Sequence, residues 1–484
     1  MTEDLAVLAR QALERGEEAE AAPVLAEAAA RARTDARLWQ WSGSLHRALD
    51  EYALALAAFA KAAALAPDDP SIAFGRALVA FEAGLDAVAL FEAADRLVPR
   101  NSEVLQCMAA ARVAAGDGAR AIADLDAVLV ESPGWLHGHH ALARIRSMMG
   151  QRDAATASIE RALAARPRDV TLWQALIDTL SQGEHFTEMG EAARRARAAA
   201  GEHGFDLGEA IALSETGDAA GADALFARIP DGDDPVVAVR RVRHFLRTGR
   251  VEAALPLIER WAVREGAALM WPYAAIGWRL AGDPRLGWLE DPRLVSVIDL
   301  ADKLPPLDRL AGLLRGLHLA RAAPMDQSVR GGTQTDGMLF TRIEPEICAL
   351  RAAMVDAVEA HIAGLPPPDP AHPVLALRRD RRVRFSGSWS VRLGGAGRHI
   401  NHVHPMGWLS SALYIALPEP GPGHEGWLQL GAPQASLGLD LPPLRWIEPR
   451  PGRLVLFPST LWHGTVSFAQ GERLTVAFDV APPR

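Results

Sequence analysis

Apolar residues follow two different patterns along the chain. Residues 1–290 are rich in alanine and read as helical throughout. From about residue 376 onward, short apolar or β-branched runs alternate with glycine and proline turns, and no helical periodicity lies between them. The first pattern predicts helices and the second predicts short strands. We therefore expect a multidomain α + β protein, helical in its amino-terminal part and β-rich in its carboxy-terminal part.

The helical part contains an internal repeat. Its glycines recur 32–34 residues apart, at Gly84, Gly116, Gly150, Gly183, Gly217, Gly249 and Gly282. Its prolines recur in phase, at Pro67, Pro99, Pro133 and Pro167. One unit shows the whole pattern of small, aromatic and proline positions: Trp39, Gly43, Ala55, Phe59, Ala62 and Pro67. Small residues let two antiparallel helices approach, an aromatic side chain fills the gap, and the proline starts the next unit.

This pattern resembles the tetratricopeptide repeat, most clearly over residues 35–185. Beyond Pro167 the phasing proline disappears while the glycine spacing persists, so the later units are degenerate, and Gly16 marks a first, capping unit. The resemblance implies an α-solenoid over residues 1–290, whose concave face holds a peptide or a partner protein. A rigid spacer or a dimerisation arm is the alternative interpretation.

Residues 291–375 form a connector with two apolar helical stretches, Leu307–Ala320 and Ile347–Ala363. Between them lies a polar stretch, Asp326–Thr335, which we interpret as a loop over the mouth of the following domain. Its arginine, amides and hydroxyls make it a candidate substrate contact, or else a plain loop. The residues that would contact the substrate are Gln327, Arg330, Thr333 and Gln334. A proline run, Pro366–Pro370, then stiffens the entry to the last domain.

Residues 376–484 form the predicted β domain. Its apolar runs predict strands over Ser388–Leu393, Leu409–Leu417, Gly426–Leu430, Arg453–Phe457 and Arg473–Val480. About eight short strands within about a hundred residues are typical of a double-stranded β-helix, or jelly roll.

Three histidines in this domain predict a mononuclear metal site. His402 and His404 are two residues apart, so in an extended segment they face the same side. His463 follows another predicted strand, just before Gly464, and can complete the set from a neighbouring strand. His399 lies three residues before His402 and should face the other way, and His424 lies in a glycine and proline loop. Iron, zinc and copper all accept imidazole ligands.

The sequence around these histidines resembles the 2-oxoglutarate/Fe(II)-dependent oxygenases that carry tetratricopeptide repeats, in the prolyl-hydroxylase-like branch. The resemblance is carried by the stretch from His402 to Ser410, by Leu413–Ile415, by Gly452–Ser459 and by Trp462–Thr465. It implies that His402 and His463 bind Fe(II), with 2-oxoglutarate and O2 as cosubstrates. His404 stands where the family usually has a carboxylate, which departs from the usual two-histidine, one-carboxylate triad.

The same resemblance implies roles for three further residues. Arg473, ten residues after His463, would grip the far carboxylate of 2-oxoglutarate; a charged residue in an apolar strand also needs a partner on physical grounds. Arg392 lies where the family often has a cosubstrate-binding tyrosine, and it could also bind an acidic substrate. Tyr414 is a candidate hydrogen-bond partner of the cosubstrate or a core residue. Trp389, Trp408 and Trp462 are expected in the core or the pocket wall.

Composition and charge limit the kinds of partner and the compartment that we expect for this protein. The formal net charge of −9 and the absence of a lysine- or arginine-rich run exclude the electrostatic footprint of a nucleic-acid-binding protein. No apolar run is long enough to cross a membrane. Two cysteines outside any CxxC pair and an acidic amino terminus indicate a reducing cytoplasm.

Together these features predict a 2-oxoglutarate-dependent dioxygenase that hydroxylates a peptide or protein recruited by the repeats. Two alternatives remain open: a cupin-type metal dioxygenase that does not use 2-oxoglutarate, and a repeat scaffold whose barrel is inactive. The missing glutamate after His404 and the presence of Arg473 count against the cupin, and the intact histidines count against the scaffold. The oligomeric state, the substrate and the modified atom are not encoded in any pattern of the sequence.

Overall fold

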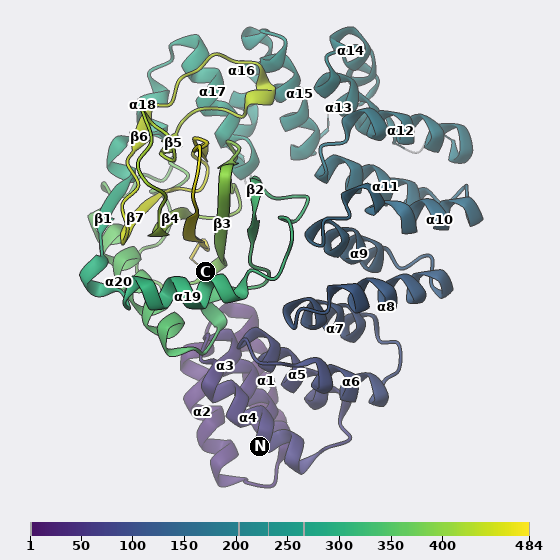
Figure 1. The fold of residues 1–484 in the computed structure, drawn as a ribbon, viewed down its shortest axis with the longest axis vertical. Helices are drawn as coiled ribbons and strands as arrows, with labels where there is room; N and C mark the ends of the chain where they lie inside the picture. Colours follow the sequence, from purple (N-terminus) through teal and green to yellow (C-terminus); the bar gives the residue numbers. More distant parts are fainter. Residues whose placement is uncertain (1, 202–203, 231, 265–266, 484) are drawn as a thin grey trace. The chain divides into compact units, whose positions relative to one another are not determined.

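The computed structural model describes residues 2–201, 204–230, 232–264 and 267–483 (Figure 1). The chain forms two compact units, one made of residues up to 127 together with 336–352, and one made of 128–335 together with 353–483. None of the helices in these described ranges combines the length and the apolar character that a membrane crossing requires. Cys107 and Cys348 are both free thiols.

The first unit consists mainly of paired helices: α1 (Thr2–Arg15), α2 (Glu18–Arg31), α3 (Ala36–Ala48), α4 (Tyr52–Leu65), α5 (Pro70–Glu82), α6 (Val88–Leu97) and α7 (Ser102–Ala114). A polar residue two positions after a phasing proline begins α5 and α7: Asp69 and Asn101 accept hydrogen bonds from backbone N–H groups of the first helical turn. Such N-caps stabilise a helix by about 1 kcal/mol, so the proline phase of the sequence marks where the repeat units start.

Small residues allow the close helix approach that the repeat predicts. A Cβ atom added at Gly43 would lie 2.7 Å from the Phe59 ring, and one added at Gly75 would lie 2.4 Å from the same ring. Phe59 therefore occupies the space that glycines on α3 and α5 leave free, and it is only 3% exposed.

The boundary between the two units at residues 127 and 128 falls within α8 (Gly118–Glu131). The helices of the second unit that follow are α9 (Leu136–Met148), α10 (Ala157–Ala165), α11 (Val170–Gln182), α12 (Phe186–Ala200), α13 (Asp206–Thr216), α14 (Ala219–Arg228), α15 (Pro235–Arg247), α16 (Val251–Ala262), α17 (Trp271–Ala281) and α18 (Arg285–Leu289). The repeating glycines adopt positive φ at the turns, for example Gly150 at +79°. At Gly183 the role passes to the next residue: Gly183 has φ −78° and Glu184 has φ +58°.

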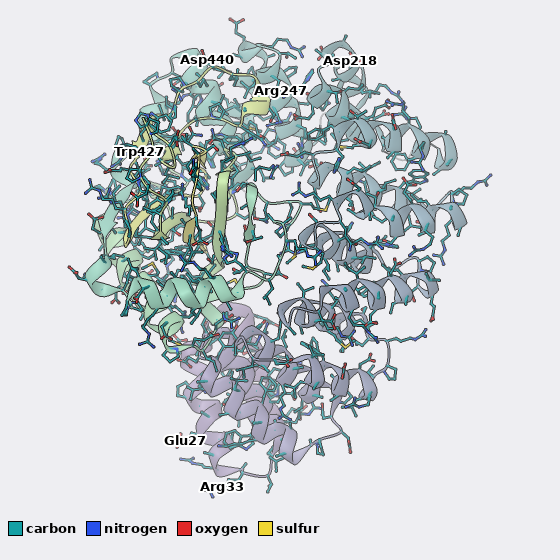
Figure 2. All side chains as sticks on the ribbon, viewed as in Figure 1. Glu27, Arg33, Asp218, Arg247, Trp427 and Asp440 are labelled. Carbon is teal, nitrogen blue, oxygen red and sulfur yellow. The ribbon has the colours of Figure 1, made fainter. Side chains whose placement is uncertain are left out.

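Two antiparallel sheets follow the helices. The larger has the order β1-β7-β4-β9-β3-β2 and the smaller the order β6-β5-β8. The strands are β1 (Ser296–Asp299), β2 (Val329–Gln334), β3 (Phe385–His399), β4 (Leu409–Ala416), β5 (Leu428–Leu430), β6 (Arg445–Ile447), β7 (Arg453–Pro458), β8 (His463–Thr465) and β9 (Arg473–Val480). A buried apolar cluster that includes Tyr414, Leu428 and Phe457 joins the two sheets, and side chains fill the space around these strands (Figure 2). The prediction of helical repeats followed by a β-rich part is confirmed.

The connector differs from the prediction, because it adds strands as well as helices. Helices α19 (Leu307–Leu317) and α20 (Pro345–Gly364) lie near the predicted positions, but β1 and β2 form the two edges of the larger sheet. The expected loop over Asp326–Thr335 therefore contains strand β2. Its glycines have a steric reason: a Cβ atom at Gly332 would lie 2.3 Å from the carbonyl oxygen of Arg392 on β3. Glycine here permits strand pairing with an irregular register, rather than indicating a loop.

Acid should destabilise the fold through His361. This side chain on α20 is 5% exposed and contacts the Ser296 hydroxyl at 2.7 Å, and burial lowers the pKa of His361 to about 4. The unfolded chain binds a proton near pH 6.5, so the free energy of unfolding should fall by about 1.4 kcal/mol per unit as the pH drops from 6.5 toward 4. Urea unfolding at pH 7 and pH 5 should show a smaller drop for His361→Gln than for the unchanged chain. Equal drops in the free energy of unfolding for the two proteins would contradict the assignment of this pH dependence to His361.

Candidate metal centre

A short backbone bridge brings two of the predicted histidines together. His402 lies in the segment between β3 and β4, and His463 is the first residue of β8. The His402 N–H donates to the His463 carbonyl at 2.9 Å, and the His463 N–H donates back at 3.0 Å. The two imidazole centroids lie 4.2 Å apart. This bridge adds the His402 segment as a further extended piece beside β8 in the smaller sheet.

His404 completes the cluster. Its backbone N–H donates to the Ser459 carbonyl at 2.9 Å, and its ring stacks on Trp389 with centroids 5.7 Å apart. One ring nitrogen from each of His402, His404 and His463 lies within 4.8 Å of the other two. The structure therefore brings all three predicted ligands to one point.

The hydrogen bonds indicate which nitrogen each imidazole offers. Nδ1 of His402 lies 2.8 Å from the Ile400 carbonyl oxygen, and Nδ1 of His463 lies 2.9 Å from the Leu461 carbonyl oxygen. A carbonyl can only accept, so each Nδ1 carries the proton and each Nε2 is unprotonated, with a lone pair that a metal ion can use. His404 places its Nδ1 2.5 Å from Oδ2 of Asp479, which leaves its Nε2 as the ligand atom as well.

Electrostatics favour neutral imidazoles at His402 and His463. Burial, followed by the neighbouring histidines, lowers the pKa of His402 well below its usual range and that of His463 to about 3. Metal ligands must be unprotonated, so these two side chains need not lose a proton at neutral pH before they coordinate an ion.

The cavity holding the histidines is lined along one side by strand β9. Alternate residues of a strand face the same way, and here Arg473, Thr475, Ala477 and Asp479 all line this cavity. Trp389 and Phe457 contribute aromatic wall, whereas Trp408 and Trp462 are buried in the core at 5% and 3% exposure. The expected role of the three tryptophans as wall or core agrees with these positions.

Arg473 is a buried cation without an acidic partner. Its side chain is 3% exposed, Nη1 donates to the Gly426 carbonyl at 2.5 Å, and Nε has no partner. The guanidinium lies 5.1 Å from the centroid of the Tyr414 ring. Among the residues that the structure describes, none pairs a carboxylate with Arg473. Such a charge is costly unless a ligand supplies the anion, and a carboxylate is an anion that a guanidinium can bind through two parallel hydrogen bonds.

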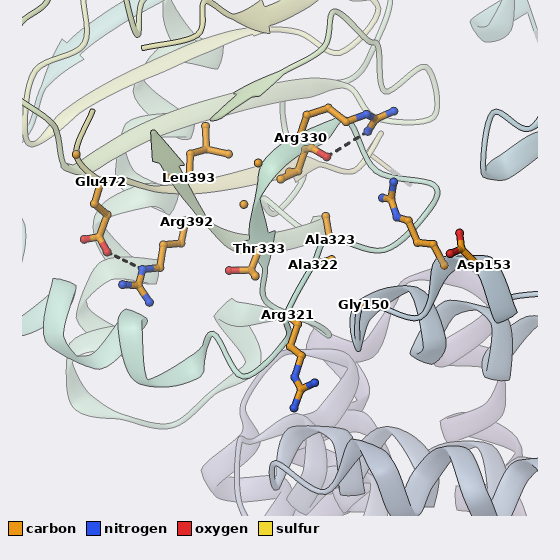
Figure 3. A pocket seen from close by; sticks show the side chains of 16 residues that line it. Gly150, Asp153, Arg321, Ala322, Ala323, Arg330, Thr333, Arg392, Leu393 and Glu472 are labelled. Atoms are coloured by element: carbon orange, nitrogen blue, oxygen red, sulfur yellow. Dashed lines mark hydrogen bonds and ion pairs between the residues drawn. The ribbon is translucent and has the colours of Figure 1, made fainter. Parts of the chain in front are cut away.

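Tyr414 lies in the core, and Arg392 lies on the exposed side of β3. Tyr414 is fully buried on β4 beneath Arg473, and its hydroxyl has no partner. Arg392 does not reach the histidines: Val391 and Leu393 beside it are buried, and Arg392 lies on the opposite, exposed side of β3. It pairs with Glu472 at 2.6 Å in a separate pocket (Figure 3). Strand alternation thus separates Arg392 from the place where the resemblance put it.

The four residues predicted to contact the substrate, in the polar stretch before β3, do not all line the same cavity. Gln327 and Gln334 line the cavity with the histidines, and the Gln334 amide donates to Gln327 at 3.3 Å. Arg330 lies at the outer mouth and pairs with Glu184 at 2.8 Å. Thr333 contacts His318 at 2.8 Å and lines the separate pocket (Figure 3). The structure therefore brings Gln327 and Gln334 to the candidate centre, but not Thr333.

His399 differs from the expectation that it faces away. Strand β3 ends at this residue and the chain turns, so His399 lines the same cavity, with its ring centroid 6.0 Å from that of His402. The Ser328 hydroxyl lies 3.0 Å from Nδ1 of His399 and 3.2 Å from Nε2 of His402. Ser328 and Asp479 were not singled out from the sequence. Asp479 could have been, because it follows Arg473 by six residues and so shares its face.

Gly464 supports the bridge between the histidines. A Cβ atom there would lie 2.0 Å from Oδ1 of Asn401, which accepts from the Gln429 amide at 2.7 Å. Gly464→Ala should displace Asn401 and the adjoining His402, and lower the affinity for Fe(II) by about 10-fold, the low end of what lost support around a metal ligand costs.

An anaerobic chelator competition measures that affinity. Gly316→Ala on α19, where a Cβ atom meets nothing within 4 Å, should bind Fe(II) as the unchanged chain does. Unchanged affinity in Gly464→Ala would show that the bridge tolerates displacement of Asn401.

Two family models match parts of the chain. The family described as "Putative 2OG-Fe(II) oxygenase" matches residues 387–479, and the tetratricopeptide repeat matches residues 36–69. One chain thus carries both features that its sequence resembles. No curated protein matches the chain.

Several solved structures of repeat proteins are similar to parts of the chain. A MamA protein is 13% identical and covers 35% of this chain and 94% of its own, with a TM-score of 0.31. A tetratricopeptide repeat protein from Parabacteroides merdae is 16% identical and covers 49% of this chain and 96% of its own, with a TM-score of 0.31. YrrB, described as a TPR protein with an unusual peptide-binding site, is 18% identical and covers 38% of this chain and 96% of its own, with a TM-score of 0.26.

Proposed function

We propose that this protein is a 2-oxoglutarate/Fe(II)-dependent oxygenase of the prolyl-hydroxylase-like branch, which hydroxylates a side chain of a peptide or protein. The observation that carries the proposal is the pairing of two features in one cavity: three convergent imidazoles and the buried Arg473 without an acidic partner. The oxygenase family match over residues 387–479 supports it.

Each group in the cavity has a task under this proposal. His402, His404 and His463 would hold Fe(II) through Nε2 and leave coordination positions open. Arg473 would pair with the far carboxylate of 2-oxoglutarate, with its guanidinium held by Gly426 and by the face of Tyr414. Trp389 and Phe457 would exclude water. When bound, iron with 2-oxoglutarate and O2 supplies the oxidising chemistry that C–H hydroxylation requires.

The mouth of the cavity supports a polypeptide substrate. A cleft outside His402 and His404 is lined by Gln182 and Glu184, from the turn between helices α11 and α12, and by Asp326–Ser328. The Arg330–Glu184 ion pair joins the two sides of this cleft. A substrate held by the second unit's repeats would therefore reach the candidate iron site through a cleft that those repeats help to form.

Conversion of 2-oxoglutarate tests the proposal. Anaerobically purified protein loaded with Fe(II) should form succinate and CO2 from 2-oxoglutarate once oxygen is admitted, and the metal-free protein should form none. Loaded protein that binds iron but neither binds nor converts 2-oxoglutarate would contradict the proposal.

A cupin-type dioxygenase is the second candidate, because all three clustered ligands are histidines and none is a carboxylate. It would bind the metal but consume oxygen without 2-oxoglutarate. Under that function Arg473 has no assigned ligand, so the effect of Arg473 on 2-oxoglutarate binding separates the two candidates.

A further inference from the structure

The three candidate ligands differ in what fixes their Nδ1 atoms. His402 and His463 donate to backbone carbonyls, at 2.8 and 2.9 Å. His404 alone meets a carboxylate, at 2.5 Å from Asp479. We infer that Asp479 acts through His404 as a positioning residue that supplies the negative charge missing from the three-histidine metal site. This inference rests on the proposed function, since it concerns the same site.

The fold holds the Asp479 carboxylate for this contact. Asp479 is 8% exposed on β9 and lies directly across from Ser410 on β4. The Ser410 hydroxyl donates to Oδ1 at 2.6 Å and also contacts the Ser459 hydroxyl at 3.0 Å. Oδ2 is left to His404. Within the described residues, His404 is the one basic side chain that contacts this carboxylate, so no arginine or lysine neutralises it.

Charge counting shows what the carboxylate contributes. Three neutral imidazoles on a divalent ion leave a charge of about +2 at the site, whereas two imidazoles and one carboxylate leave about +1. A carboxylate that accepts from the second ring nitrogen of a ligating histidine raises the basicity of that ligand and offsets positive charge at the metal. Asp479 would thus place, behind the imidazole ring of His404, the charge that an oxygenase of this kind usually carries at the position of His404.

A purely structural role would need only a hydrogen-bond acceptor. Asparagine has nearly the same shape as aspartate and can still accept from Nδ1 of His404, so Asp479→Asn removes charge while it retains the bond. The matched control is Asp299→Asn at the far edge of the same sheet. The Asp299 carboxylate is exposed and pairs with Arg453, so this change removes one charge without touching the cavity.

Two measurements test the inference on the full chain: the affinity for Fe(II), from anaerobic competition with a chelator, and the midpoint potential of the bound iron. Asp479→Asn should bind Fe(II) about 10- to 100-fold more weakly, as expected for loss of a partner of a ligating histidine. Its potential should be more positive, because the lost anion favoured the ferric ion. Asp299→Asn should match the unchanged chain in both.

The outcomes separate this inference from the proposed function. If the unchanged chain binds iron and Asp479→Asn matches it in both affinity and potential, Asp479 supplies no charge, and the proposed function still stands. A weaker affinity with an unchanged potential would also overturn the inference, because it would reduce Asp479 to a structural acceptor. Asp479→Glu, which keeps the carboxylate on a longer side chain, gives a second comparison should the asparagine variant fail to fold. Its potential should stay near that of the unchanged chain even if its affinity for Fe(II) falls, and a clear positive shift of the potential would overturn the inference.

Discussion

Changing His463 to alanine is expected to abolish stoichiometric iron binding. The unchanged chain should bind one equivalent of Fe(II), and the variant should retain close to none after gel filtration. The physical reason is that two imidazoles remain where three converge. Loss of a ligand should exceed the about 10- to 100-fold loss of affinity that follows removal of a partner behind a ligand. The backbone bridge between residues 402 and 463 does not depend on the side chain, so the fold should survive.

His424, which lies on the loop between β4 and β5, provides the control for this measurement. His424 stacks on Trp446 with centroids 4.4 Å apart and is exposed outside the cavity. His424→Ala should bind iron as the unchanged chain does. Full iron content in His463→Ala would remove it from the ligand set. Full content in His404→Ala would point to Asp479 as a replacement ligand, because its carboxylate already lies beside His404.

The convergence of the three histidines is the part of the candidate site that the sequence predicted most completely. The two-residue spacing of His402 and His404 reflects local geometry, which a sequence carries directly. The contact with His463 depends on a long-range backbone bridge. Its position before Gly464 was the available signal, and the structure shows why glycine is needed there: a side chain would collide with Asn401.

The remaining site residues show where local patterns fail. Arg392 was assigned by its distance from His402 along the chain, but the alternation of β3 turns its side chain away from the cavity. Asp326–Thr335 has the composition of a loop, yet its glycines allow β2 to approach β3. Asp479 stands in an apolar run, and only pairing of β9 with β4 brings it to Ser410 and His404.

The helical repeats were predictable because their signals are local and periodic. Glycine supplies the positive φ of most of the turns, and the residues two positions after Pro67 and Pro99, which are Asp69 and Asn101, cap the next helix. The later units lack the phasing proline but remain helical through α17. There, buried ion pairs such as Arg243 with Glu215 contribute contacts that no periodic pattern encodes. The domain limits at residues 290 and 375 stay predictions.

Changing Arg473 to alanine is expected to weaken 2-oxoglutarate binding by about 100-fold or more. Loss of one partner of a buried charge pair costs about 3–5 kcal/mol, and each 1.4 kcal/mol is about tenfold in affinity. Titration of 2-oxoglutarate into Fe(II)-loaded protein without oxygen, followed by the metal-to-ligand absorption band, measures the midpoint. Arg473→Lys should keep part of the affinity, because it keeps the charge but loses the bidentate geometry.

Arg392→Ala is the matched control for this titration. It removes a guanidinium from the same sheet, one that pairs with Glu472 outside the cavity, so the midpoint should not change. Iron content should be unchanged in all these variants, because neither arginine is a ligand. A midpoint for Arg473→Ala equal to that of the unchanged chain would favour the cupin-type function instead.

The free protein offers an independent measurement of the same residue. Without a ligand, Arg473 is a buried cation that no carboxylate of the described chain neutralises. Replacing a buried ion pair by apolar side chains of similar size is often neutral or stabilising by about 1–4 kcal/mol, and a buried cation without an acidic partner should change stability in the same direction. Metal-free Arg473→Met should therefore melt at the same temperature as the unchanged chain or higher, while 2-oxoglutarate with Fe(II) should raise the melting temperature of the unchanged chain only. A lower melting temperature for metal-free Arg473→Met would mean that the arginine stabilises the β-sheets themselves, and that its burial is structural rather than a provision for an anionic ligand.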